Sequence, residues 1–137
     1  MSSSVKEFNS VGEFVKYIDD SIAELRRRLG EMLKRVEELR VKVEQEKKLR
    51  SILGKLGLPE PSTHNEIVLR NLRVVVNPGP AQELTAYEAA IESLNSRIML
   101  LTAIRKEVEV LGSIDVEIRL MVIYSDDIPK VVLLKFM

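Results

Sequence analysis

The amino-acid sequence predicts an α+β fold with two long helices, one of them carrying a coiled-coil heptad seam, and a small three-stranded β-sheet. The expected order is α-β-α-β-β. Apolar residues spaced three and four apart, together with N-terminal capping boxes, predict the helices. Alternating apolar residues near the C-terminus predict the sheet. The chain has 137 residues, which suits one compact core, so we expect a single domain over residues 1–137.

The first helix is expected over residues 10–56. Ser10 and Glu13 form a capping box, and Gly57 followed by Pro59 marks the end. Between these limits apolar residues alternate three and four apart, which is a heptad seam. The seam consists of Val15, Ile18, Ile22, Leu25, Leu29, Met32, Val36, Leu39 and Val43. A stripe of this length is not stable in water, so we expect a helical partner to cover it.

Apolar residues leave the heptad register after residue 45 and reappear at Leu49, Ile52, Leu53 and Leu56. We therefore expect the last turns of this helix to pack against a different element. A loop is expected over 57–66, where prolines obstruct helix formation. It contains His64, the only histidine of the chain.

β-branched residues over 67–77, ended by Asn-Pro-Gly-Pro, predict the first strand. The second helix is expected over 81–111. Its start lies between residues 80 and 86, because Pro80 suits a first helical position and Thr85 with Glu88 forms a second capping box. Apolar residues surround this helix over 98–104, so we expect a sheet or a second subunit to cover it on several sides.

A β-hairpin is expected over 114–137, with its turn at Asp126 and Asp127. The strand at 67–77 can join this hairpin through a right-handed crossover, or it can lie apart from it. We favour one three-stranded sheet, because an isolated strand leaves its backbone groups unpaired.

The composition excludes several classes of function. The chain has no cysteine and six scattered glycines, so it has no thiolate chemistry, disulfide framework or glycine-rich phosphate loop. We predict no catalytic, cofactor-binding or metal-binding residues, and therefore no enzyme. No apolar run approaches the length of a membrane span and no signal-peptide pattern is present, so we expect a cytoplasmic protein without membrane contact. Abundant Glu, Lys and Arg with few amides resemble a thermophile composition.

Basic residues are in excess along the first helix and are candidates for nucleic-acid contact. The candidates are Arg26, Arg27, Arg28, Lys34 and Arg35. The whole chain is neutral, with 21 basic and 21 acidic residues, whereas dedicated nucleic-acid-binding proteins usually carry a basic excess. Several pairs such as Glu24 and Arg28 lie four apart with the acid first, which is typical of a solvated helix surface. Nucleic-acid binding is therefore the alternative hypothesis.

The leading hypothesis is a non-catalytic structural or interaction protein, a homo-oligomeric coiled-coil scaffold that presents small α/β heads. The second helix is shorter than the first, so seam residues near Val15, Ile18 and Ile22 are expected to face water unless a second chain covers them. We predict a homodimer, with a larger even-numbered bundle as second choice. An unidentified protein is a further candidate partner.

Overall fold

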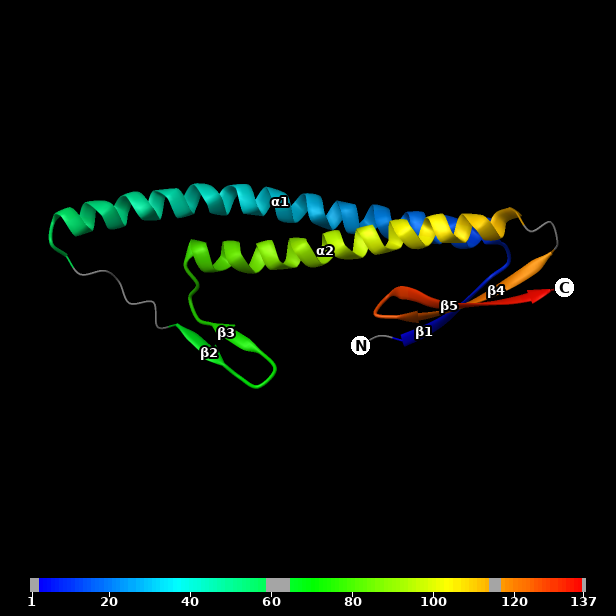
Figure 1. The fold of residues 1–137 in the computed structure, drawn as a ribbon. Helices are drawn as coiled ribbons and strands as arrows, with labels where there is room; N and C mark the ends of the chain where they lie inside the picture. Colours follow the sequence, from blue (N-terminus) through cyan, green and yellow to red (C-terminus); the bar gives the residue numbers. More distant parts are fainter. Residues whose placement is uncertain (1–2, 59–64, 114–116, 137) are drawn as a thin grey trace. The chain divides into compact units, whose positions relative to one another are not determined.

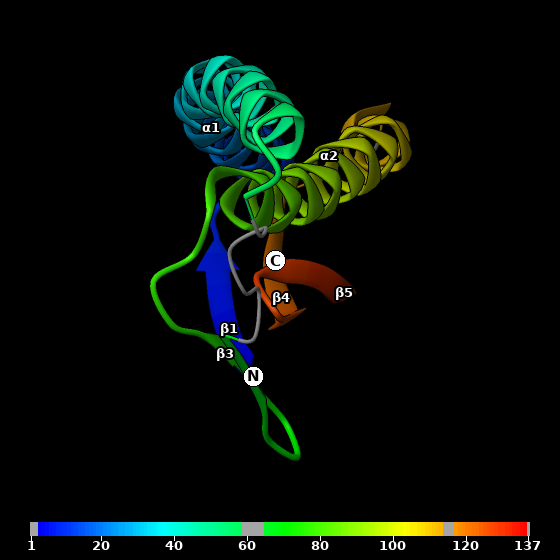
Figure 2. The same cartoon turned by 90° about the vertical axis from the view of Figure 1, so that its left-hand side faces the viewer.

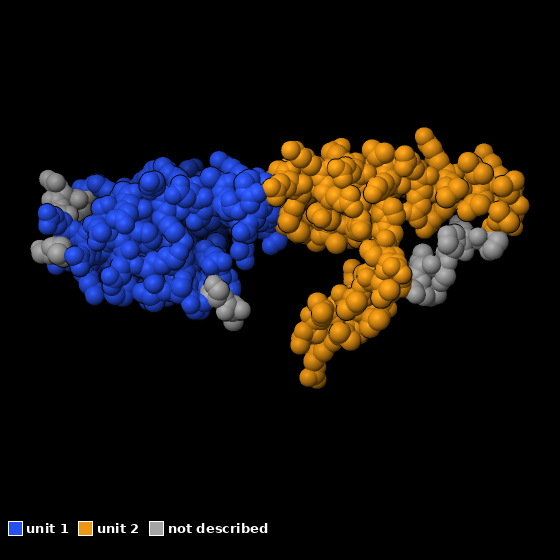
Figure 3. Space-filling view, turned by 180° about the vertical axis from the view of Figure 1, so that it is seen from behind, with its two compact units in different colours: residues 1–29, 93–137 blue, residues 30–92 orange. Residues whose placement is uncertain are grey.

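The elements follow one another as β1 (Ser3–Phe8), α1 (Val11–Lys55), β2 (Glu66–Val68), β3 (Arg73–Val75), α2 (Pro80–Glu109), the short 3-10 helix η1 (Val110–Ser113), β4 (Ile118–Ser125) and β5 (Ile128–Phe136) (Figures 1 and 2). The computed structural model describes residues 3–58, 65–113 and 117–136. The chain divides into two compact units, residues 1–29 with 93–137 (unit 1) and residues 30–92 (unit 2) (Figure 3). Both long helices contribute segments to both units.

Unit 1 contains an antiparallel sheet in the order β1-β4-β5. β4 is the central strand, and it pairs with β1 from Ser3↔Ser125 to Phe8↔Leu120. Asp126 and Asp127 connect β4 to β5 with φ angles of 53° and 63°. Both aspartates therefore adopt the left-handed conformation that a two-residue hairpin turn requires, and Asp tolerates it better than most residues.

The core of unit 1 lies between this sheet and the two helices, which cover one face of it (Figures 1 and 2). Alternate residues of β4 are buried because their side chains all point toward the helices. The buried cluster consists of Phe8, Phe14, Ile18, Ile22, Leu101, Val108, Ile118, Leu120, Val122, Tyr124 and Ile128. Two of its rings, Phe8 and Phe14, pack with centroids 5.0 Å apart.

Unit 2 contains the later part of α1, the earlier part of α2 and the two-stranded sheet β2-β3. Val36 and Leu39 of α1 are its buried core residues. Arg35 connects the two helices by donating a hydrogen bond to Glu83 at 3.2 Å. The side-chain amides of Asn65 and Gln82 donate to each other's carbonyl oxygens at 2.8 Å, which ties the start of the β2–β3 hairpin to α2.

Local signals define the ends of α1. The Ser10 hydroxyl accepts a hydrogen bond from the Glu13 amide at 3.1 Å, as the capping box predicts. At the other end, Gly57 has a φ of 72° and its amide donates to the Gly54 carbonyl, while the Leu58 amide donates to the Leu53 carbonyl. These two bonds form a Schellman motif, which satisfies carbonyls that the helix leaves unpaired.

The start of α2 differs from the capping box expected at Thr85. The helix begins at Pro80, and the Gly79 carbonyl accepts hydrogen bonds from the Gln82 and Glu83 amides. Thr85 lies inside the helix, where its hydroxyl donates to the Ala81 carbonyl at 3.0 Å. Pro80 therefore takes the first helical position, which does not need an amide hydrogen.

The α+β class, the two long helices and the three-stranded sheet are confirmed, but the sheet contains a different third strand. The segment expected as one strand over 67–77 is the separate hairpin β2–β3. The strand that pairs with the C-terminal hairpin is instead β1, which is hydrogen-bonded to β4 and lies in a segment where no strand was predicted. The hairpin over 114–137 is found from Ile118 to Phe136, while residues 114–116 and 137 lie outside the described residues, as does the part of the expected loop that contains His64.

Candidate interaction surface

The nine seam residues of α1 are all buried or half-buried within the chain itself. Ile18 and Ile22, which were expected to face water without a second chain, belong to the core of unit 1, and Ile18 is 1 % exposed. That argument for an oligomer was wrong, because the sheet of unit 1 covers this part of the seam. Contact between seams of two chains stays a prediction.

Three of the five candidate nucleic-acid contacts are engaged in ion pairs. Arg27 donates to Glu24 at 2.7 and 3.0 Å, and Arg28 donates to the same carboxylate at 3.3 Å. These bonds lower the pKa of Glu24 to about 2, with the Arg27 hydrogen bond as the largest cause. Arg35 binds Glu38 and Glu83. Arg26 and Lys34 are exposed, so the basic residues form no continuous free row along α1.

The β2–β3 hairpin of unit 2 carries apolar side chains that no other part of the described chain covers. The β2–β3 hairpin pairs Glu66 with Val75, Ile67 with Val74 and Val68 with Arg73. Paired residues share a face and neighbours alternate, so Ile67 lies on one face and Val68 on the other. Both are exposed, and Val68 is 75 % exposed. Exposed apolar side chains therefore project from both faces of the hairpin.

The hairpin and the end of α1 together expose nine aliphatic side chains. We call five of them the hairpin set: Ile67, Val68, Leu69, Leu72 and Val76. The other four are the helix-end set: Leu49, Ile52, Leu56 and Leu58. The helix-end set includes the out-of-register residues that were expected to pack against another element. Each of the nine is about half exposed or more. The five residues of the hairpin set lie close together in sequence, and such a concentration of exposed apolar residues is unusual in a monomeric protein.

The hairpin is held to the rest of unit 2 mainly at its base. The Val76 amide donates to the Asn65 carbonyl at 2.8 Å, and Asn65 reaches α2 through Gln82. At the tip, the Leu69 amide donates to the Leu72 carbonyl at 2.7 Å. Within unit 2, the hairpin projects from the helices (Figures 1 and 3). Among the described strands no third strand pairs with β2 or β3, so each has one open edge.

The apolar, β-branched sequence of this segment predicts a strand correctly, but it does not indicate that the strand character belongs to an exposed hairpin outside the main sheet. Residues 98–104 of α2 also differ from the expectation that a sheet or a second subunit covers this part of the helix on several sides. Met99 is 72 % exposed and Leu100 is also exposed, so the chain alone does not provide this cover.

The described residues contain no cluster of three or more side chains suited to a metal ion. Among these residues, neither α1 nor α2 is long and apolar enough to cross a lipid bilayer.

Comparisons with protein family models, with curated proteins and with solved structures find no match for the chain.

Proposed function

We propose that this chain is a non-catalytic structural or interaction protein that assembles with copies of itself, and that the hairpin set forms the main contact. The observation that carries the proposal is the exposure of apolar side chains on both faces of the β2–β3 hairpin. A two-stranded hairpin is marginally stable in water, and further strands or a packed helix stabilise it. A second copy supplies such strands.

The size of the exposed area supports a stable contact rather than a passing one. The five aliphatic side chains of the hairpin set are each about half exposed or more, so they supply a large part of the area that one partner contributes to a standard interface, about 800 Å². Burial of apolar surface contributes roughly 25 cal/mol per Å² before the costs of association are subtracted.

The sequence of the hairpin also suits pairing with itself. When β2 pairs with β2 of a second copy around a two-fold axis at Ile67, Glu66 lies opposite Val68 of the other copy. When β3 pairs in the same way around Val74, Arg73 lies opposite Val75. Neither arrangement places like charges opposite each other, which would destabilise the pair. Both arrangements are closed and symmetric, as is usual for homo-oligomers.

Light scattering coupled to size exclusion tests the proposal. We expect the wild-type mass at micromolar concentration to be a multiple of 15.6 kDa. Val68→Lys should reduce it to the mass of one chain, because a lysine ammonium at the centre of the contact must lose its hydration. A mass of 15.6 kDa for the wild type at every concentration would contradict self-assembly.

Val110→Lys is the matched control, because Val110 in unit 1 is 70 % exposed and lies outside the hairpin set. This variant should keep the wild-type mass. If both variants keep it, the contact lies elsewhere and the assignment to the hairpin is wrong. If both dissociate, the change in net charge is responsible rather than the hairpin.

Nucleic-acid binding by α1 is the second candidate, and the exposure of Arg26 and Lys34 favours it. Electrophoretic mobility of duplex and single-stranded nucleic acid over a range of salt concentrations separates the two. Steeply salt-dependent binding that Arg26→Glu with Lys34→Glu abolishes would support this alternative. We expect no shift at physiological salt, because Glu24, Glu38 and Glu83 already neutralise the neighbouring arginines.

A further inference from the structure

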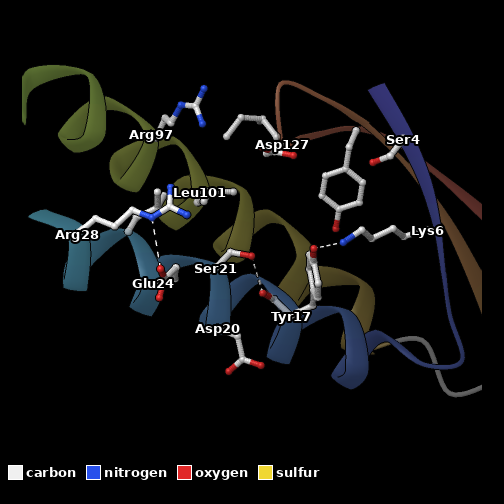
Figure 4. A pocket seen from close by; sticks show the side chains of 13 residues that line it. Ser4, Lys6, Tyr17, Asp20, Ser21, Glu24, Arg28, Arg97, Leu101 and Asp127 are labelled. Carbon is white, nitrogen blue, oxygen red and sulfur yellow. Dashed lines mark hydrogen bonds and ion pairs between the residues drawn. The ribbon is translucent and has the colours of Figure 1, made fainter. Parts of the chain in front are cut away.

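A pocket lies in unit 1, lined by residues from β1, α1, α2, β4, the β4–β5 turn and β5 (Figure 4). Its volume is about 320 Å³, at the lower end of the range for small-molecule sites, roughly 300–1,000 Å³. Three apolar residues, Leu25, Leu101 and Ile128, line part of it. The other lining side chains are charged or carry hydroxyl groups, so the pocket combines an apolar surface with several polar groups.

Two arginines from facing helices line the pocket, Arg28 on α1 and Arg97 on α2. Figure 4 shows both toward the same end of it. Arg28 shares the Glu24 carboxylate with Arg27, which makes the shorter bonds to it. Arg97 makes no ion pair or side-chain hydrogen bond with any residue that the structure describes. At this end of the pocket, therefore, the Arg97 guanidinium and part of the Arg28 guanidinium have N–H donors that make no hydrogen bond within the described residues. Guanidinium donors bind carboxylate and phosphate groups in a bidentate manner.

Two further carboxylates, those of Asp20 and Asp127, line the pocket, and Arg97 forms no ion pair with either. Figure 4 shows the Asp20 carboxylate pointing away from Arg97 and Lys6.

The other end of the pocket contains two tyrosines and a lysine. Lys6 donates a hydrogen bond to the Tyr17 hydroxyl, and its ammonium lies 5.7 Å from the ring centroid of Tyr124. Tyr124 is only 4 % exposed, and its hydroxyl has no hydrogen-bond partner among the described residues. A buried tyrosine hydroxyl usually finds a partner. Burial raises the pKa of Tyr124, so this hydroxyl keeps its proton and remains a donor.

We propose that this pocket binds a small organic anion whose carboxylate or phosphate group is held by Arg28 and Arg97. The apolar body of the ligand packs on Leu25 and Leu101. The proposal uses residues of unit 1 only, so it is independent of self-assembly through the hairpin set of unit 2.

Isothermal titration calorimetry at low ionic strength tests the class of ligand with four probes: phenyl phosphate, benzoate, inorganic phosphate and phenol. We expect phenyl phosphate or benzoate to bind at least about tenfold more tightly than the two fragments that lack either the body or the charge. The tighter of the two identifies the preferred anionic group. The absence of binding by both at millimolar concentration, or equal binding of phenyl phosphate and inorganic phosphate, would overturn the proposal.

Arg97→Gln should weaken binding of the better probe at least about tenfold, because it removes a charged donor pair. Arg26→Gln is the control, since Arg26 lies on α1 but does not line the pocket. It should change the affinity by less than about twofold. Equal losses in both variants would mean that general positive charge, not the pocket, attracts the anion.

Discussion

Asp19 of α1 accepts two hydrogen bonds from the Arg105 guanidinium of α2, so residues 86 positions apart in sequence form an ion pair within unit 1. The same guanidinium donates to Glu109 one turn further along α2. The hydrogen bond to Asp19 is the largest cause of the raised pKa of Arg105. This interaction fixes which turns of the two helices lie opposite each other at the surface of unit 1.

Asp19→Asn should lower the melting temperature by no more than a few degrees, because both side chains are partly exposed and water screens their attraction. The difference should shrink as salt is added. Asp20→Asn is the control, since the adjacent Asp20 makes no ion pair within the described residues. Equal melting temperatures for wild type and Asp19→Asn at low salt would contradict the prediction. Scanning calorimetry measures both variants.

Leu39→Ala should destabilise the protein by about 2–5 kcal/mol, because the Leu39 side chain is fully buried and its truncation leaves a cavity. Leu33→Ala makes the same chemical change on the same helix where the side chain is 47 % exposed. It should cost less than about 0.5 kcal/mol. Urea denaturation measures both free energies. Similar costs for the two variants would show that the seam of α1 is not buried in unit 2.

The two glycines at the end of α1 should respond in opposite directions to alanine. Gly57 has a φ of 72°, so Gly57→Ala should destabilise by roughly 1–2 kcal/mol. Gly54 is helical and a methyl group there meets no atom within 4 Å, so Gly54→Ala should stabilise by roughly 0.5–1 kcal/mol. Thermal unfolding followed by circular dichroism compares them. A loss of stability in Gly54→Ala would mean that this end of the helix is frayed.

Glu24 should titrate at unusually low pH. Its pKa in the folded state is about 2, against 4.5 for the free side chain. Because the folded-state value is the lower one, the carboxylate favours folding above pH 4.5, and this contribution is lost as the pH falls from about 4.5 to 2. NMR of the side-chain carboxyl carbon follows the midpoint. Arg27→Gln should raise the midpoint toward 4.5, and an unchanged midpoint would assign the shift to another group.

The helices were predictable because their signals are local. Capping at Ser10 depends on four consecutive residues, and the Schellman motif on the short segment from Leu53 to Leu58. The heptad spacing of α1 indicated correctly which of its faces is covered, although it did not indicate what covers it. In unit 1 that cover is partly a β-sheet, and a heptad pattern alone does not distinguish a sheet from a helix as the partner.

The strands were harder to predict. β1 reads Ser-Ser-Val-Lys-Glu-Phe, which has little β-branched content, and its hydrogen bonds go to residues at the far end of the chain. The β2–β3 hairpin was read as one strand because its turn, Leu69-Arg-Asn-Leu72, contains neither glycine nor proline. Both errors arise because strand pairing is set by partners distant in sequence or by turns with few characteristic residues, here Asn71 alone.

The pocket of unit 1 was not predicted because Lys6, Arg28, Arg97 and Tyr124 lie in four separate segments. Arg28 is a predicted candidate for nucleic-acid contact, and no pattern in the sequence marks Arg97. One signal is present in the sequence: Tyr124 continues the apolar alternation of Ile118, Leu120 and Val122, which places a hydroxyl group at a buried position. Its lack of a partner became visible only in three dimensions.

The arrangement of the two units along the chain affects how the protein forms during synthesis. Residues 30–92 are contiguous, so all of unit 2 can leave the ribosome and fold while the rest of the chain is still being made. Unit 1 must wait, because β4, the strand that pairs with both β1 and β5, follows all of unit 2 in the chain. Until then Phe8, Phe14 and Ile18 have no sheet to pack against. During this interval the nascent chain carries an exposed apolar N-terminal segment, and it exposes the hairpin set to neighbouring nascent copies on the same messenger RNA.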